Sequence, residues 1–487
     1  MGVLKSKFHN TSTTFPALPF EKSKTDIFIP HKKYRPFPVE LRSEPRTICS
    51  TFSAMPRTTG RRPVNWFMEY GIQEPLENFL WLVDCEFIPC SDVELVGCGG
   101  ISTIRSISPR LMTPEGFVVK WHLASTTAYR IYPGTSSAEY FPQPRIRPHP
   151  NGKYVCFVDG CKIYVQDIET GAFNERERLK FDTSYYISAH CCGAVSPNGA
   201  YLAFIARFGD EFELSVIETR AFRVVGRVRY SDIGRDEYVG GECKWSPDSQ
   251  FIAIAMSNGD ISLVDCRDKK RPEPFLNVVD DFEKFGSRIS NPRAFDFDPK
   301  SAHSVLAFAT RGNASKLHVY DVDEKAVVRS TVLTTNEHEA DDEDDFFLFY
   351  GRNCPLRYSR SGDVIAVTLG LRIQILNAND LRVIYILDGI AQDNGGYVRQ
   401  LATGKYPFTI HVSFSRFDEY LAVSSTDGFI RVWQLDADLN LQDLCRKVIL
   451  ASTYCDRVKF LPIPDRLKFY LLQIPDWAAS CDAEAYV

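Results

Sequence analysis

The chain contains 487 residues and carries a formal net charge of −5 at pH 7. This length exceeds the roughly 250–300 residues at which a single hydrophobic core stops growing, so the chain holds several domains or an array of repeated units. The acidic balance offers no basic surface for nucleic acid, and the sequence contains no apolar run of the ~18–20 residues that cross a bilayer.

Residues 1–60 are expected to form an extended or disordered arm, because they are rich in Pro, Ser and Thr. The arm lacks the hydrophobic stretch of a secretory signal, so we expect the protein in the cytoplasm, with a nuclear location left open. Its first residues, MGVLKSK, match the pattern for N-myristoylation, with Gly2 as the acceptor and Ser6 in the hydroxyl position. One acyl chain would add only a weak membrane association, and an unmodified arm is the alternative.

Six segments share one pattern: a turn of the Pro-Asn-Gly or Ser-Pro-Asp type, an aromatic or aliphatic residue, and alternating small and large apolar residues. They are HPNGKYVCFV from His149, SPNGAYLAFI from Ser196, SPDSQFIAIA from Ser246, DPKSAHSVLAFA from Asp298, SRSGDVIAVT from Ser359 and SRFDEYLAVS from Ser415. The apolar stretches recur at intervals of about fifty residues, which is near the period of a propeller blade with long loops. The pattern predicts a repeated array of short strands and turns.

Upstream, FLWLVDCEFIP from Phe79 and GFVVKWHL from Gly116 supply the strands of one further unit. We therefore predict an all-β fold, a β-propeller of seven blades within residues 61–437, with eight blades as the alternative. The units resemble WD40 repeats, although only DGFIRVWQ, from Asp427 to Gln434, contains the tryptophan strand, with Gln434 in place of the usual aspartate. Because the Gly-His pairs that open such repeats are missing, the inner hydrogen-bond network of a typical WD40 blade is not implied. A propeller is a binding platform and says nothing by itself about chemistry.

Between two of these units lies an acidic run, NEHEADDEDD, from Asn336 to Asp345. Its like charges repel one another, so we expect a solvated loop, and recruitment of a basic target is the alternative reading. The apolar residues that follow, Phe346 to Tyr350, are interpreted as a buried strand.

Most of the 14 cysteines are expected to be reduced and to act as small apolar residues within strands, as at Cys156, Cys243 and Cys266. Neither Cys85 with Cys90 nor Cys191 with Cys192 has the CxxC spacing of a zinc site, so no metal or other cofactor is expected. The sequence contains no GxSxG, HExxH or GxxxxGK[ST] motif, and no catalytic residue is predicted.

From residue 441 the spacing changes from that of strands to that of a helix. Five apolar residues at i, i+3, i+4, i+7 and i+8 share one helical stripe: Leu441, Leu444, Cys445, Val448 and Ile449. Asn440 precedes them as a candidate N-cap. A second amphipathic stretch follows the segment Leu461-Pro462-Ile463-Pro464, with Pro464 in the first turn of the helix. About fifty residues are too few to bury two apolar stripes alone, so this tail needs a partner.

The tail resembles a SOCS box, which we assign to residues 438–487. LQDLCRKVI is similar to an Elongin C-binding box, with Leu441, Cys445 and Ile449 at its three apolar positions, and LPIP is similar to the cullin box associated with the fifth cullin. The resemblance implies that the first helix binds Elongin C with Elongin B, and that Leu461, Pro462, Ile463 and Pro464 contact a cullin that carries a RING partner. Together with the blades it indicates the WD-repeat and SOCS-box-containing protein family.

The sequence therefore predicts the non-catalytic substrate receptor of a ubiquitin ligase, in which the propeller binds an unknown protein target. The alternative is a plain WD40-repeat scaffold or adaptor, with no ubiquitin role, whose tail packs on its own propeller.

Overall fold

The structure is a computed structural model, and it describes the chain in separate stretches between residues 67 and 472. These are residues 67–71, 78–89, 91, 94–103, 115–122, 127–132, 146–159, 162–168, 173–178, 192–208, 211–221, 223–231, 243–255, 261–278, 295–310, 315–333, 355–369, 372–387, 409–425, 429–435, 445, 449, 458 and 460–472. All of them belong to one compact unit, Pro36–Val487. Among these residues, no helix has the length and apolar character of a membrane span.

Several predicted features lie outside the described residues. They are the arm with Gly2, the acidic run Asn336–Asp345, the apolar run Phe346–Tyr350, and Leu441, Leu444 and Val448 of the first tail helix.

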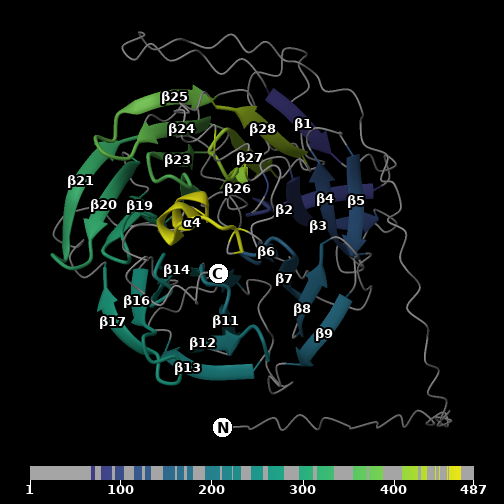
Figure 1. Ribbon diagram of the computed structural model, residues 1–487, viewed down its shortest axis with the longest axis horizontal. Helices are drawn as coiled ribbons and strands as arrows, with labels where there is room; N and C mark the ends of the chain where they lie inside the picture. Colours follow the sequence, from purple (N-terminus) through teal and green to yellow (C-terminus); the bar gives the residue numbers. More distant parts are fainter. Residues whose placement is uncertain are drawn as a thin grey trace, which may run out of the picture. The chain divides into compact units, whose positions relative to one another are not determined.

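The described strands form seven four-stranded antiparallel sheets, which we number as blades in chain order (Figure 1). Blade 1 contains β2 (Asn78–Phe87), β3 (Glu94–Thr103), β4 (Glu115–His122) and β5 (Thr127–Tyr132). Blade 2 contains β6 (Ile146–Pro148), β7 (Tyr154–Asp159), β8 (Lys162–Asp167) and β9 (Phe173–Arg178). Blade 3 contains β10 (Cys192–Val195), β11 (Tyr201–Phe208), β12 (Glu211–Glu218) and β13 (Arg223–Ser231).

The later blades repeat this order, with the first strand of each innermost. Blade 4 contains β14 (Cys243–Trp245), β15 (Phe251–Ala255), β16 (Ile261–Asp265) and β17 (Glu273–Asn277). Blade 5 contains β18 (Phe295–Phe297), β19 (Val305–Thr310), β20 (Lys316–Asp321) and β21 (Ala326–Val332). Blade 6 contains β22 (Leu356–Tyr358), β23 (Val364–Leu369), β24 (Arg372–Asn377) and β25 (Val383–Leu387). The predicted all-β propeller is confirmed, and the described sheets match the expected number of blades.

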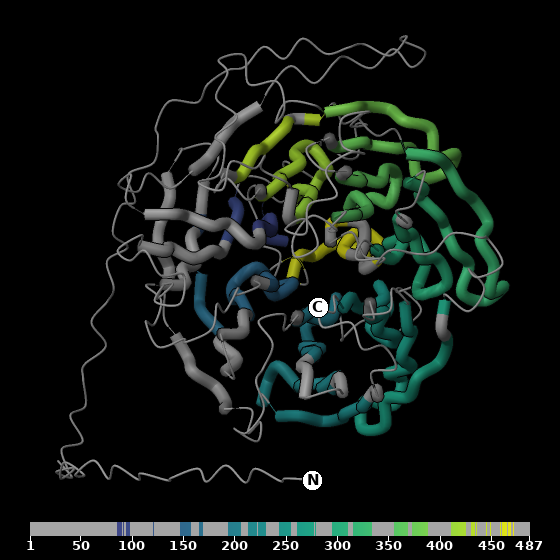
Figure 2. Tube along the Cα trace, turned by 180° about the vertical axis from the view of Figure 1, so that it is seen from behind, coloured from purple at the N-terminus to yellow at the C-terminus, as the bar shows by residue number. Residues whose placement is uncertain are grey.

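Blade 7 is built from both ends of the propeller sequence. It contains β26 (Thr409–Phe414), β27 (Tyr420–Ser425), β28 (Phe429–Gln434) and, as its outer strand, β1 (Phe67–Gly71). β1 pairs antiparallel with β28, so that Phe67 lies opposite Trp433 and Gly71 opposite Phe429. The inner strand β2 then lies against β26, so blade 1 packs beside blade 7 and the ring closes (Figure 1). Figure 2 shows the ring from behind. The sequence pattern did not predict β1.

The hydrophobic core consists of layers between neighbouring blades. One such layer joins blades 3 and 4 through Ile205, Val216, Ile252 and Val264. The predicted alternation of small and large apolar residues has its reason in the second strand of blades 3 to 7. There a buried alanine lies opposite the middle of the inner strand, as at Ala203, Ala253, Ala307, Ala366 and Ala422.

The predicted reduced cysteines are confirmed at Cys156, Cys243 and Cys266, which are free and buried. Burial raises the pKa of the Cys156 thiol to about 12, so it stays protonated and packs as an apolar group.

The turns that follow the inner strands explain the repeated Ser-Pro-Asp and Pro-Asn-Gly segments. In blade 4, Ser246 Oγ accepts a hydrogen bond from Phe251 N at 2.9 Å and donates one to Asp248 Oδ1 at 2.5 Å. Asp248 Oδ1 also accepts a hydrogen bond from Gln250 N at 2.9 Å. The residue after the aspartate, Ser249, has a φ of 60°. In other blades the same position is Gly152, Gly199 or Gly362, because glycine adopts a positive φ without a steric penalty.

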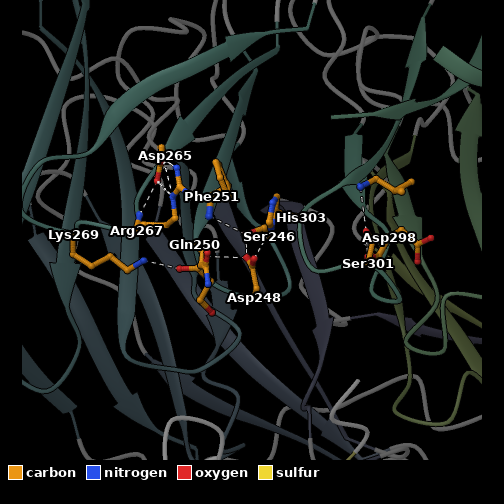
Figure 3. Close-up of polar contacts among 12 residues, drawn as sticks. Ser246, Asp248, Gln250, Phe251, Asp265, Arg267, Lys269, Asp298, Ser301 and His303 are labelled. Carbon is orange, nitrogen blue, oxygen red and sulfur yellow. Dashed lines mark hydrogen bonds and ion pairs between the residues drawn. The ribbon is translucent and has the colours of Figure 1, made fainter. Parts of the chain in front are cut away.

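Neighbouring turns contact one another around one end of the ring, which we call the turn end. The contacts join His149 to Gly199, Asn198 to Ser249, Asp248 to His303, Lys300 to Asp363, and Asp418 to Arg360 and Ser361. Figure 3 shows the part of this belt that joins blades 4 and 5. Because strands alternate in direction, each outer strand ends and the next inner strand begins at the opposite end, which we call the link end.

Charged side chains of the inner strands are buried and join blades that are not neighbours in sequence. Glu86 of blade 1 accepts hydrogen bonds from Arg357 Nη2 at 2.5 Å and from Ser413 Oγ at 2.9 Å. His411 Nε2 lies 2.8 Å from the same carboxylate. Burial alone would raise the pKa of Glu86, but Arg357 and His411 outweigh it and hold that pKa well below its usual range. Lys244 extends this network, with its Nζ 3.3 Å from Asp296 Oδ1.

Candidate functional site at the C-terminal segment

The C-terminal segment leaves the propeller at the turn end. β28 runs toward that end, and the next residue, Leu435, donates its N–H to the carbonyl oxygen of Glu419 at 2.7 Å. Glu419 belongs to the turn between β26 and β27, and the Leu435 side chain is buried. The segment therefore begins against the inner turn of blade 7.

Two residues of the predicted first helix are described. Cys445 and Ile449 both have helical backbone, and both side chains are exposed. Four residues separate them, so they lie on the same face of a helix. Cys445 is a free thiol. The described members of the predicted apolar stripe are thus exposed.

A compact turn leads into the second helix. Leu461 N donates to the carbonyl oxygen of Val458 at 3.1 Å, and Ile463 N donates to that of Leu461 at 2.8 Å. Val458 is fully buried, whereas Leu461 and Ile463 are half-buried and Pro462 is exposed. One side of the turn therefore faces the protein, and Pro462 points outward.

The second helix, α4, spans Asp465–Leu472 and follows directly on Pro464. The carbonyl oxygen of Pro464 accepts the first helical hydrogen bonds, from Leu467 N at 2.9 Å and Lys468 N at 3.2 Å. Pro464 thus lies immediately before the first turn, where its missing N–H leaves no helical bond unmade.

α4 has a buried side and an exposed side. Leu471 is 3% exposed, while Leu467, one turn earlier, is 50% exposed, and Phe460, ahead of the helix, is 76% exposed. Arg416 of the blade 7 turn donates from Nη2 to the carbonyl oxygen of Leu471 at 3.3 Å, so the buried side contacts the propeller. The two sides of this region thus differ in exposure.

The sequence predicted an amphipathic stretch after Pro464, but it did not separate the side that faces the propeller from the side that faces outward. It also missed Arg416. The only signal for that residue is a basic side chain in a repeat turn, and Arg360 occupies the same place in the blade 6 turn without being buried.

A polar cluster in the turns of blades 4 and 5 contains the residue types of a hydrolase site (Figure 3). His303 Nδ1 lies 2.6 Å from Asp248 Oδ2, and Ser246 Oγ donates to the other oxygen of Asp248. The aspartate, however, lies between the serine and the histidine, and Ser246 is fully buried with its oxygen bonded to Phe251 N. A nucleophilic serine needs the histidine beside it as a base, so this cluster is structural.

The Asp248 hydrogen bond raises the pKa of His303, against a smaller opposite effect of burial. The ring of His303 also lies 4.5 Å from that of Phe251, centroid to centroid. His303 thereby joins blades 4 and 5 through the contact with Asp248 and the ring contact with Phe251.

The SOCS box family model matches residues 439–472, which include the predicted first helix, the Leu-Pro-Ile-Pro segment and α4. No curated protein matches the chain.

Proposed function

We propose that this protein is the target-recognition subunit of an Elongin-cullin-RING ubiquitin ligase. The observation that carries the proposal is the SOCS box match to residues 439–472, on a segment that exposes apolar side chains beside a propeller. A SOCS box suggests an adaptor to Elongin B, Elongin C and a cullin, and a propeller suits the binding of a protein target.

The first helix is the proposed contact with Elongin C, through Leu441, Leu444, Cys445, Val448 and Ile449. The exposure of Cys445 and Ile449 supports this contact, because a helix that only packed on the propeller would bury the same stripe. Burial of each large apolar side chain in a partner's pocket contributes about 1.5–3 kcal/mol.

The proposed contact with the cullin is the segment Leu461 to Pro464. The exposed side chains of Phe460 and Leu467 flank it and enlarge the apolar surface. We assign a cullin of the fifth class, with its RING partner, from the Leu-Pro-Ile-Pro sequence.

The target is proposed to bind at the link end of the propeller. The C-terminal segment contacts the turn end at Leu435 and again at Leu471, which supports a target site at the opposite end of the ring. Rate enhancement would then come from holding target lysines near the ubiquitin-loaded conjugating enzyme, and no side chain of this chain takes part in bond making.

The experiment is co-purification of the tagged full-length protein with Elongins and cullins from cells. The wild-type protein should recover both, and alanine at Leu461, Pro462, Ile463 and Pro464 should spare the Elongins and reduce the cullin. Recovery of neither by the wild-type protein would contradict the proposal.

The burial of Val458 and Leu471 favours one alternative, a scaffold whose tail only packs on its own propeller. Such a scaffold would recover no Elongins, and its first helix would be protected from solvent in the absence of any partner.

A further inference from the structure

We propose that Arg416 is a positioning residue that caps α4 and fixes the C-terminal segment to blade 7. The interaction itself lies within this chain, and only its consequence for ubiquitin transfer rests on the proposed function.

The end of α4 needs a donor. The last carbonyl groups of a helix have no partner within the helix, and they carry the negative end of its dipole. α4 has no basic residue in its own last turn. Arg416, from a different part of the chain, supplies both a hydrogen bond and a positive charge at the carbonyl oxygen of Leu471.

Contacts within the propeller hold the Arg416 side chain in place. Its side chain is 5% exposed, and its guanidinium carbon lies 5.5 Å from the centre of the Phe417 ring. The next residue of the turn, Asp418, accepts hydrogen bonds from Arg360 N at 2.7 Å and Ser361 N at 2.9 Å in blade 6. The donor therefore projects from a turn that two blades immobilise, and a buried charge strengthens its hydrogen bond.

One turn thus contacts the C-terminal segment at two points. Glu419 binds the N–H of Leu435, where the segment begins, and Arg416 binds Leu471 near the end of α4. Between these two points, Cys445, Ile449 and Leu467 remain exposed. This arrangement would hold a bound Elongin and cullin at a fixed orientation to the propeller, because the segment cannot swing about its exit from β28.

The test compares hydrogen exchange in Arg416→Met, Arg416→Lys and Arg360→Met. Arg360 is the matched control, because it has the same place in the blade 6 turn but an exposed side chain. Loss of a cap and a charged hydrogen bond should speed exchange in peptides that cover α4 by about five- to tenfold in Arg416→Met. Arg416→Lys should restore part of the protection, and Arg360→Met should leave it unchanged.

Peptides from β26 to β28 report whether the propeller stays folded. If Arg416→Met does not fold, Arg416→Gln replaces it, because its amide has no positive charge and a shorter reach to the carbonyl oxygen of Leu471, and it should also speed exchange in α4. Unchanged α4 exchange in the folded variant, or equal effects of the Arg416 and Arg360 substitutions, would overturn the proposal.

A second measurement separates this inference from the proposed function. With Elongins and cullin bound, Arg416→Met should still capture them, but ubiquitin should spread over more lysines of a bound target or of the receptor itself. If the wild-type protein captures no Elongin, the proposed function fails while the exchange result still decides the role of Arg416. An unchanged set of modified lysines in the variant would show that the cap does not set the orientation.

Discussion

Glu86→Gln should destabilise the propeller strongly, because it removes a charge on which the buried network between blades depends. The Glu86 side chain is 10% exposed, and its carboxylate contacts Arg357 at 2.5 Å and His411 at 2.8 Å. Glutamine keeps the shape but leaves the arginine without its main counter-charge, since Asp296 is 3.8 Å from Arg357. Removal of one partner of a buried ion pair costs about 3–5 kcal/mol of the free energy of unfolding.

The matched control is Glu94→Gln in the next strand of the same blade. Glu94 pairs with Lys120 at 2.6 Å, but its side chain is 27% exposed. Ion pairs near the surface contribute about 0–1 kcal/mol, so this variant should be nearly as stable as the wild type.

The assay is urea unfolding followed by tryptophan fluorescence at neutral pH and in acid. Because the folded pKa of Glu86 is lowered, its contribution is present above the unfolded pKa of about 4.3 and is lost as pH falls through the folded pKa. The difference between wild type and Glu86→Gln should therefore shrink in acid. Equal losses in the two variants at neutral pH would refute the account of the network.

Two further perturbations test the belt of turns and the packing between blades. The pKa of His303 is raised, so its contribution is full below an unfolded pKa of about 6.5 and is lost as pH rises through the folded value. His303→Gln should therefore lower the melting temperature more at about pH 6 than at about pH 8.5. The charges that act on the His303 ring are those of Asp248, Arg267 and Asp323. An effect independent of pH would count against the pairing of His303 with Asp248. A Cβ at Gly226 would lie 2.2 Å from the backbone oxygen of Lys269 in the next blade, so Gly226→Ala should lower the free energy of unfolding by about 1–3 kcal/mol. At Gly193 the nearest atoms to a Cβ are 3.5 and 3.6 Å away, so Gly193→Ala should be tolerated. Similar melting temperatures of the two variants would contradict the close approach at Gly226.

The repeats could be recognised from sequence because the turns carry local chemistry. Ser246 and Asp248 satisfy the backbone of their own turn, and Gly199 has a positive φ of 71°, so these residue types recur wherever the turn does. Strand alternation follows from the layers between blades, in which Ala253 and Ile252 point to opposite sides of one strand. Such features depend on a few neighbouring residues.

Long-range contacts left no comparable signal. β1 is a short strand with no repeat turn beside it, and its position follows only from pairing with β28 at the far end of the propeller. Glu86 and Arg357 are separated by most of the propeller sequence, and their contact depends on ring closure. Arg416 and Arg360 occupy the same position in their repeat turns, and the hydrogen bond to the Leu471 carbonyl oxygen, which distinguishes Arg416, depends on a segment far along the chain.

The SOCS box lies between these cases. Its apolar stripe and the Leu-Pro-Ile-Pro segment could be recognised locally, and the family match covers both. The side of α4 that faces the propeller could not be recognised from sequence. Leu467 and Leu471 are the same residue type at helical spacing, and they differ only in their exposure.

The most direct test of the central claim is the affinity of the purified full-length protein for purified Elongin C with Elongin B, measured by calorimetry. The wild-type protein should bind, and Leu441→Ala combined with Cys445→Ala should weaken binding by about several hundredfold, because central interface residues cost ~2–4 kcal/mol on truncation. Phe275→Ala, which removes an exposed aromatic ring from the outer strand of blade 4, should bind as the wild type does. Absence of wild-type binding, or equal affinity of the double variant, would show that the C-terminal segment is not an Elongin adaptor.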